Sequence, residues 1–140
     1  MKHEVEQFFV RYASANSSSD VLSIGDFYAD TFLFGGTSGV QPVKKEEFLG
    51  FIPKMKAHFS SMGLLQTELQ AMRGNPISSK YYLAHIGWRM TIRKSVGTSQ
   101  IDALASYILA EESGGGLSIV FQIDHQDLAT VIRDQQNAPE

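Results

Sequence analysis

The second half of this chain constrains its fold most, because from residue 64 onward it alternates β-prone runs with short turns. Apolar, aromatic and β-branched residues are interrupted there by glycine- or proline-containing breaks at 74–76, 97–98 and 114–116. The expected strands are 65–72, 81–93, 101–110 and 117–124. Since turns this short connect antiparallel neighbours, the pattern predicts an antiparallel meander.

The beginning of the chain has the periodicity of helices. Val5, Phe8, Phe9 and Tyr12 fall on one stripe at spacings of three and four, which predicts a helix over residues 3–15. Asp20 is expected to cap a second helix. Residues 30–34 then change to β-prone types, and we expect a short aromatic strand that ends at the glycine pair 35–36.

A third helix is expected after a turn-rich segment, residues 35–42. Its apolar residues are Phe48, Ile52, Met55 and Phe59, spaced by four, three and four from a start near Lys44. Pro53 removes a backbone donor and crowds the preceding turn, so a kink or two short helices meeting near 50–53 is expected. At the end of the chain, Asp127 is expected to cap a last helix that runs to about Asp134.

Helices followed by an antiparallel meander predict an α+β fold, and 140 residues, 43% of them apolar, suit one domain, 1–140. The net charge of -3 and the lack of a basic cluster argue against nucleic-acid binding. The chain has no cysteine, which excludes disulfides and thiolate chemistry. No apolar run suits a membrane span or a signal peptide, so we expect no membrane partner and a cytoplasmic location.

No pattern indicates a metal or a cofactor. The histidines, His3, His58, His85 and His125, are scattered at spacings that neither helix nor strand turns into a ligand set. The glycine-rich segment 35–39 lacks the Lys-Ser/Thr helix start of a phosphate-binding loop. We therefore expect no metal site and no cofactor.

Several segments resemble the nuclear transport factor 2-like (NTF2-like) superfamily, which includes SnoaL-like polyketide cyclases and ketosteroid-isomerase-like proteins. The resemblance rests on the first helix, the passage 27–30, the helix at 45–49, and the end formed by 106–109 and 119–128. That end is similar to a subgroup whose members mostly lack an assigned activity. The resemblance implies a cone-shaped, curved mixed sheet of the cystatin-like α+β barrel type. In that fold helices enclose a pocket, and homodimers form through the outer sheet face.

Strand alternation indicates which side chains would line such a pocket. In the longest strand, one face is apolar and is formed by Tyr82, Ala84, Ile86, Trp88, Met90 and Ile92. We predict a pocket for a small apolar or aromatic molecule, with walls formed by Tyr28, Phe32, Phe34, Trp88 and Tyr107. The tyrosine hydroxyls could also polarise a carbonyl. The alternative is that these aromatic side chains simply fill the core.

Asp124 and His125 are the catalytic candidates, because a carboxylate beside an imidazole can perform acid-base chemistry at neutral pH. Adjacent strand residues point to opposite faces, so at most one of them can enter the pocket unless the strand has ended. In the alternative interpretation, both side chains form hydrogen bonds to the segment where the chain leaves the last strand. Residues 33–36, where a ketosteroid-isomerase base would lie, contain no acid, which argues against that reaction.

Three classes of function follow from these residues. The first is a homodimeric domain that binds a small apolar ligand without catalysis. The second is an isomerase or polyketide-cyclase-type enzyme that uses Asp124 or His125 as acid or base. The third is a dimeric protein-interaction module, which predicts a large apolar sheet face and little pocket.

Overall fold

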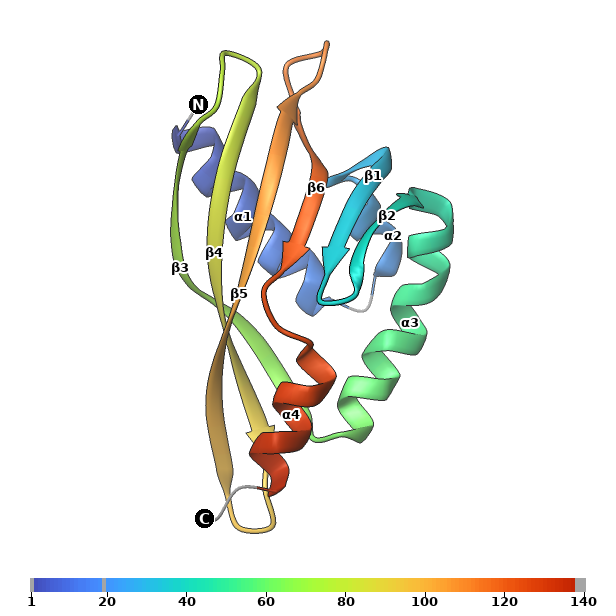
Figure 1. Ribbon diagram of the computed structural model, residues 1–140, viewed down its shortest axis with the longest axis vertical. Coiled ribbons are helices and arrows are strands. Elements are labelled where there is room, and N and C mark those ends of the chain that lie inside the picture. The colour runs from blue at the N-terminus through green and yellow to red at the C-terminus, as the bar shows by residue number, and fades with distance from the viewer. Residues whose placement is uncertain (1, 19, 138–140) are drawn as a thin grey trace.

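The computed structural model describes residues 2–18 and 20–137, so residues 1, 19 and 138–140 of the expected domain lie outside it. The elements, in chain order, are α1 (Lys2–Ser17), α2 (Val21–Gly25), β1 (Tyr28–Gly36), β2 (Gly39–Lys44), α3 (Lys45–Ser61), β3 (Leu64–Pro76), β4 (Tyr81–Arg93), β5 (Thr98–Glu111), β6 (Leu117–Asp124) and α4 (Leu128–Asn137) (Figure 1).

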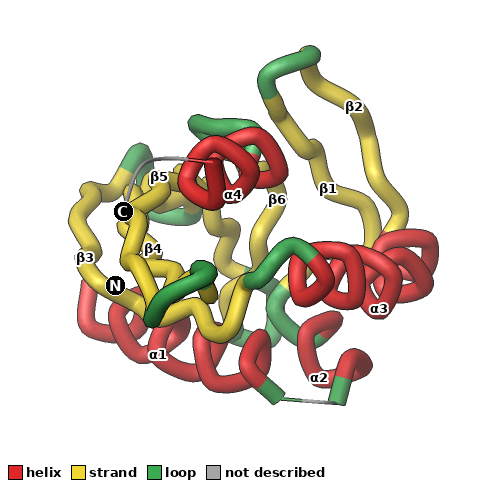
Figure 2. The backbone as a smooth tube through the Cα atoms, turned by 90° about the horizontal axis from the view of Figure 1, so that it is seen from below, coloured by secondary structure: helices red, strands yellow, loops and turns green. Residues whose placement is uncertain are grey.

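The strands form one mixed sheet in the order β2-β1-β6-β5-β4-β3. From β3 to β6 each strand pairs antiparallel with the next, which confirms the predicted meander, whereas β1 lies parallel to β6. The sheet twists and curls without closing, with α1, α2 and α3 along one side and α4 near one end (Figure 2). The fold is therefore α+β with an open, curved sheet, as predicted.

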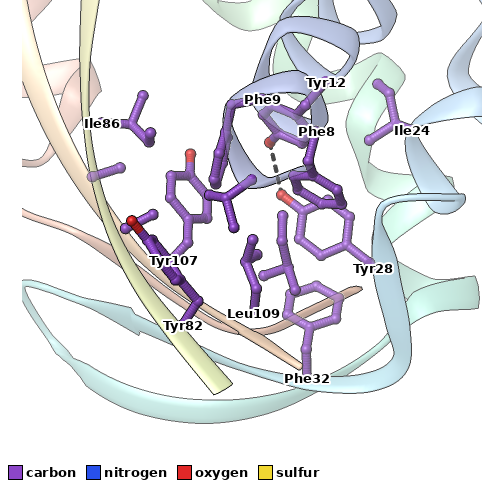
Figure 3. Packing of buried hydrophobic residues seen from close by; sticks show 14 of the residues in the cluster. Phe8, Phe9, Tyr12, Ile24, Tyr28, Phe32, Tyr82, Ile86, Tyr107 and Leu109 are labelled. Atoms are coloured by element: carbon purple, nitrogen blue, oxygen red, sulfur yellow. Dashed lines mark hydrogen bonds between the residues drawn. The ribbon is translucent and has the colours of Figure 1, made fainter. Parts of the chain in front are cut away.

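The first helix forms because its apolar stripe has a surface to cover. Val5, Phe8, Phe9 and Tyr12 are all buried, as their spacing predicts. They pack with sheet residues such as Tyr107 in a cluster of aromatic rings in contact (Figure 3). Tyr12 and Tyr107 meet edge to face, an arrangement that adds to the energy of burial. The cluster holds α1 across the sheet.

The segment 35–42 is not the loop that its composition suggests. β1 continues through both glycines, and β2 pairs with it antiparallel, with Gly36 opposite Gly39. Gly39 has φ +123, a conformation that favours glycine at this turn. β2 is an edge strand with mostly exposed side chains, so it lacks the alternation of a buried strand and tolerates Pro42. The expectation of a turn-rich loop here is wrong.

The expected break at Pro53 is also absent, because α3 is one helix of 17 residues. Ile52 is buried against the core, while Pro53 faces solvent. Since helical stability comes mainly from packing of the apolar face, the helix continues through the proline on its exposed side. The two-helix alternative is therefore wrong.

Both predicted caps lie at the starts of their helices. Asp20 occupies the N-cap position of α2, but its side chain makes no capping bond, and its carbonyl instead accepts from the Ser23 hydroxyl at 2.7 Å. Asp127 directly precedes α4, and its carboxylate accepts from the Thr130 hydroxyl at 2.8 Å. The last helix ends at Asn137, beyond the expected residue.

Candidate functional site

A cavity of about 780 Å³ lies between the concave face of the sheet and helices α1, α3 and α4. The aromatic residues predicted for the pocket all line it: Tyr28, Phe32, Phe34, Trp88 and Tyr107. They come from β1, β4 and β5, so the curl of the sheet brings them together. Most of these side chains also belong to the main hydrophobic cluster, which means that they serve as core and cavity wall at once.

Strand alternation buries the predicted apolar face of β4, but only Trp88 and Met90 of that face line the cavity, while its other residues are core. Tyr82, Ala84, Ile86, Trp88, Met90 and Ile92 are buried, and on β5 Ala103, Ala105 and Tyr107 are buried beside them. The small side chains of Ala103 and Ala105 line the cavity opposite the helices. The space therefore exists partly because β5 carries alanine at positions where a larger residue would fill it.

A chain of hydrogen bonds crosses the cavity wall. The Trp88 indole donates to the Tyr107 hydroxyl at 3.2 Å, and the ring of Tyr107 lies beside that of Tyr12, with centroids 6.1 Å apart. The Tyr12 and Tyr28 hydroxyls lie 2.8 Å apart (Figure 3). Tyr28 donates to Gln122 Oε1 at 2.5 Å, so its only hydroxyl hydrogen is used and Tyr12 must be the donor to Tyr28. The hydroxyl donors of Tyr12 and Tyr28 therefore point in one direction, toward Gln122.

These phenols are held neutral. Burial raises the pKa of Tyr12 to about 12 and raises those of Tyr28 and Tyr107 well above their ordinary value. A neutral phenol retains its hydrogen for donation. The hydrogens of Tyr12 and Tyr28 are used within the wall, whereas Tyr107 accepts from Trp88 and can donate its own hydrogen to a carbonyl or an enolate oxygen.

Asp124 is the last acceptor in this series of hydrogen bonds. It lies opposite Ala105 on β6, lines the cavity, and accepts a hydrogen bond from Gln122 Nε2 at 3.1 Å. Burial raises the pKa of its carboxyl, although the Gln122 hydrogen bond and the charge of His125 act to lower it. A carboxylate with a raised pKa beside an apolar cavity has the properties of a general base.

His125 lies on the opposite side of the sheet. Its Nε2 is 2.7 Å from Ser106 Oγ, and the same hydroxyl is 2.7 Å from His85 Nδ1. Ser106 lies between two cavity-lining residues of β5 and so points to the outer face. The backbone N–H of His125 donates to the Leu104 carbonyl at 3.1 Å. The structure therefore separates the two catalytic candidates and leaves Asp124 alone at the cavity.

Tyr12, Gln122 and Lys56 also line the cavity, although the sequence did not indicate them as site residues. Tyr12 was assigned to the buried stripe of the first helix, because one tyrosine among phenylalanines has no distinguishing pattern. Gln122 lies two residues before Asp124 on the same strand face, so alternation from Asp124 could have found it. Lys56 follows Ile52 by four residues and therefore flanks the apolar stripe of α3.

Lys56 reaches the C-terminal end of α1. Its Nζ donates to the Asn16 carbonyl at 2.6 Å and to the Ser18 carbonyl at 3.1 Å. Lys56 and both acceptor residues line the cavity. Partial burial lowers the pKa of the amine from its ordinary value. The cavity thus has one cationic group, Lys56, on its helical side, and its acidic lining residues are Asp124 on β6 and Glu47 in the first turn of α3.

The outer face of the sheet is apolar in its middle. Leu33 and Ile123 are 39% and 36% exposed on neighbouring strands, and the partly buried Ile108 and Phe121 lie beside them. Toward the other end, Arg89 pairs with Asp102 at 3.0 Å. The described helices α1, α2 and α3 lie along the other side of the sheet, so they leave this face open (Figure 2).

Two further features concern the described residues as a whole. No group of three or more His, Asp or Glu side chains among them is placed to hold a metal ion. None of the helices in the described ranges is long and apolar enough to cross a membrane.

Solved structures share this fold over nearly the whole chain. Aln2 from a Streptomyces species is 16% identical, with a TM-score of 0.72 and 93% of each chain covered. An NTF2-like protein with a cystatin-like fold from Novosphingobium aromaticivorans is 9% identical, with a TM-score of 0.71 over 94% of this chain and 87% of that one. An NTF2-like protein of unknown function from Shewanella oneidensis is 10% identical, with a TM-score of 0.69 over 90% of this chain and 98% of that one.

These identities are low enough that the likeness shows the fold alone. The chain has the NTF2-like, cystatin-like fold, as the sequence resemblance implied. No protein-family model matches the sequence, and no curated protein matches it. The fold and the cavity together define the class, a domain with the NTF2-like fold built around an aromatic cavity.

Proposed function

We propose that the cavity binds a small apolar or aromatic molecule. The observation that carries this proposal is the cavity itself, about 780 Å³ with an aromatic lining, which lies within the usual range of roughly 300–1,000 Å³ for ligand sites. Apolar walls with a few converging polar groups are typical of such sites. Here those groups are the tyrosine hydroxyls, Gln122, Asp124 and Lys56.

The single tryptophan makes the test direct. Because Trp88 lines the cavity, its fluorescence should change saturably when the protein is titrated with a panel of steroids, flavonoids and aromatic polyketides. Ala105→Leu places a larger side chain in the cavity and should weaken binding by about tenfold or more. Ala110→Leu, on the same strand but away from the cavity, is the matched control. The proposal fails if no compound gives a saturable change, or if both variants bind like the wild type.

Proton transfer is the second candidate function, favoured by Asp124 at the cavity with a raised pKa. Its carboxylate would take a proton from the carbon beside a ligand carbonyl, and the electron pair would move to the carbonyl oxygen. A neutral tyrosine such as Tyr107 would donate a hydrogen bond to that oxygen. Return of the proton to a different carbon would complete an isomerisation, while attack of the enolate carbon on a second carbonyl would complete a cyclisation.

Deuterium exchange tests this step without knowledge of the natural substrate. In D2O, the protein should accelerate exchange of the α-protons of 2-tetralone, and Asp124→Asn should reduce that acceleration by about 10²- to 10⁴-fold. The rate should rise with pH through the raised pKa of Asp124, since the carboxylate is the base. His125→Asn, which changes the outer face, is the control. Equal exchange by the wild type and Asp124→Asn would contradict a catalytic carboxylate.

We also propose that the protein is a homodimer that pairs through the outer sheet face. The support is the apolar middle of that face and the absence of a described helix over it. Leu33→Lys should then shift the molecular mass in sedimentation from dimer to monomer. Val10→Lys, an exposed apolar position on α1, is the control. A monomeric wild type with intact ligand binding would remove the dimer and the protein-interaction alternative while leaving the binding proposal unchanged.

A further inference from the structure

Lys56 is a cation held at the cavity wall by main-chain groups. The carbonyls of Asn16 and Ser18, at 2.6 and 3.1 Å, lie at and just beyond the C-terminal end of α1, where backbone oxygens lack helical partners and carry partial negative charge. Such acceptors favour the ammonium form. An ammonium group has three donors, and these carbonyls occupy two of them. The third remains to bind a group inside the cavity.

The charge of Lys56 is not neutralised by a carboxylate. Within the described ranges, no acidic side chain forms an ion pair with it, and desolvation is the factor that shifts its pKa. Removal of a cation from water is unfavourable unless it gains a partner. Of the residues that line the cavity in the described structure, Lys56 is the only basic one. An anionic group that entered the cavity would find its favourable partner there.

The two acidic residues that line the cavity orient such a ligand. The carboxylates of Asp124 on β6 and Glu47 in the first turn of α3 would both repel an anion, so the acidic group is directed away from them and toward Lys56, nine residues after Glu47 on α3. Tyr12 and Asn16 are four residues apart on α1, an axial rise of about 6 Å. The hydroxyl chain and the ammonium site are therefore about one helical turn apart along the same wall, a separation that a compact aromatic acid can span.

We propose that Lys56 is an anion-binding group of the cavity and that the ligand is an apolar or aromatic carboxylic acid. Its carboxylate would pair with Lys56, and its body would lie against the aromatic wall that includes Trp88 and Tyr107. This inference rests on the proposed binding function and specifies the chemical class of the ligand.

Matched pairs of compounds test the charge separately from the apolar body. Binding of 2-naphthoic acid, biphenyl-4-carboxylic acid and indole-3-acetic acid, each beside its methyl ester, would be measured by calorimetry at pH 7.5. We expect at least one acid to bind at least fivefold more tightly than its ester. Lys56→Met keeps the length of the side chain and removes the charge, so it should abolish the preference while changing ester affinity less than twofold.

Two further variants protect the interpretation. Lys54→Met removes an exposed lysine of the same helix that does not line the cavity, and it should leave the preference unchanged. Lys56→Arg keeps a cation and should retain at least half of the preference. Lys56→Arg also keeps a donor for the carbonyls at the end of α1. It therefore shows whether Lys56→Met acts through loss of the charge or through a change in the end of that helix.

The outcomes separate the two proposals. Esters that bind as tightly as their acids, or a preference that survives in Lys56→Met, would overturn the anion site while the binding function stands. No binding by any acid or ester would overturn the binding function and this inference with it. An acid preference that Lys56→Met removes and Lys56→Arg retains would support both.

Discussion

The two faces of the sheet carry similar residues in different surroundings. On the inner face, Asp124 and Gln122 meet buried phenols at an apolar cavity. On the outer face, Ser106 links His85 and His125, with His125 exposed to solvent. Asp124 and His125 are adjacent in sequence, yet strand alternation gives them different neighbours. Adjacent residues in the sequence therefore need not share a site, whereas alternate residues of one strand, such as Gln122 and Asp124, meet on the same face.

The difference in burial is tested best on β6, where each face carries an isoleucine. Ile119 is fully buried on the inner face, and Ile123 is 36% exposed on the outer face. Ile119→Ala should lower the free energy of unfolding by about 2–5 kcal/mol, and Ile123→Ala by about 1 kcal/mol or less. Urea denaturation at low protein concentration measures both without a contribution from dimer formation. Equal losses would contradict the difference in burial between the two faces.

The hydrogen-bond chain should also be sensitive to the loss of a single hydroxyl. Tyr28→Phe leaves the Tyr12 donor and the Gln122 acceptor without their partner, and both are shielded from water. The expected loss is about 1–3 kcal/mol. Ser106→Ala removes the corresponding hydroxyl of the outer face, where His125 can bond water, so its loss should be under about 1 kcal/mol. Thermal denaturation ranks the two variants, and the reverse order would contradict the comparison.

Much of the inner face could be predicted from the sequence because burial leaves a periodic record. The stripe of α1 and the alternation around Trp88 were both visible, and they led to the aromatic wall. The edge strand β2 has no alternating apolar pattern, since its side chains are mostly exposed on both faces. Pro53 was misleading because a proline signals a break locally, while the packing of Ile52 is a tertiary effect.

The polar part of the site was harder to foresee. Alternation stated that Asp124 and His125 would be separated, but it could not tell which of them would face the cavity. The contacts of Tyr12 with Tyr28 and of Lys56 with Asn16 join segments far apart in the chain. Contacts of this kind depend on how α1 and α3 pack against the sheet, which a single sequence does not encode in any local pattern.

The raised pKa of Asp124 gives the inner face a pH dependence. Because its pKa is higher in the folded state than in the unfolded state, the folded protein binds more protons, and this contribution to stability falls as the pH rises through the folded pKa. Asp124→Asn removes the carboxyl group and with it the free-energy cost of ionising that group in the folded state. The asparagine oxygen still accepts the hydrogen bond from Gln122. Its stability relative to the wild type should therefore increase from pH 4 to pH 8, by up to about 1 kcal/mol for a partly exposed carboxyl. A difference that does not vary with pH would contradict this account.

The smallest effect is expected where the outer face is fully solvated. Arg89 Nε donates to Asp102 Oδ1 at 3.0 Å, and this contact lowers the pKa of the Asp102 carboxyl. Exposed pairs gain little, because water screens the charges and two long side chains lose freedom. Asp102→Asn should leave the midpoint of thermal unfolding unchanged within error, at both low and high salt. A clear loss that disappears at high salt would show that this part of the sheet is shielded from water, as it would be beneath a second copy of the chain.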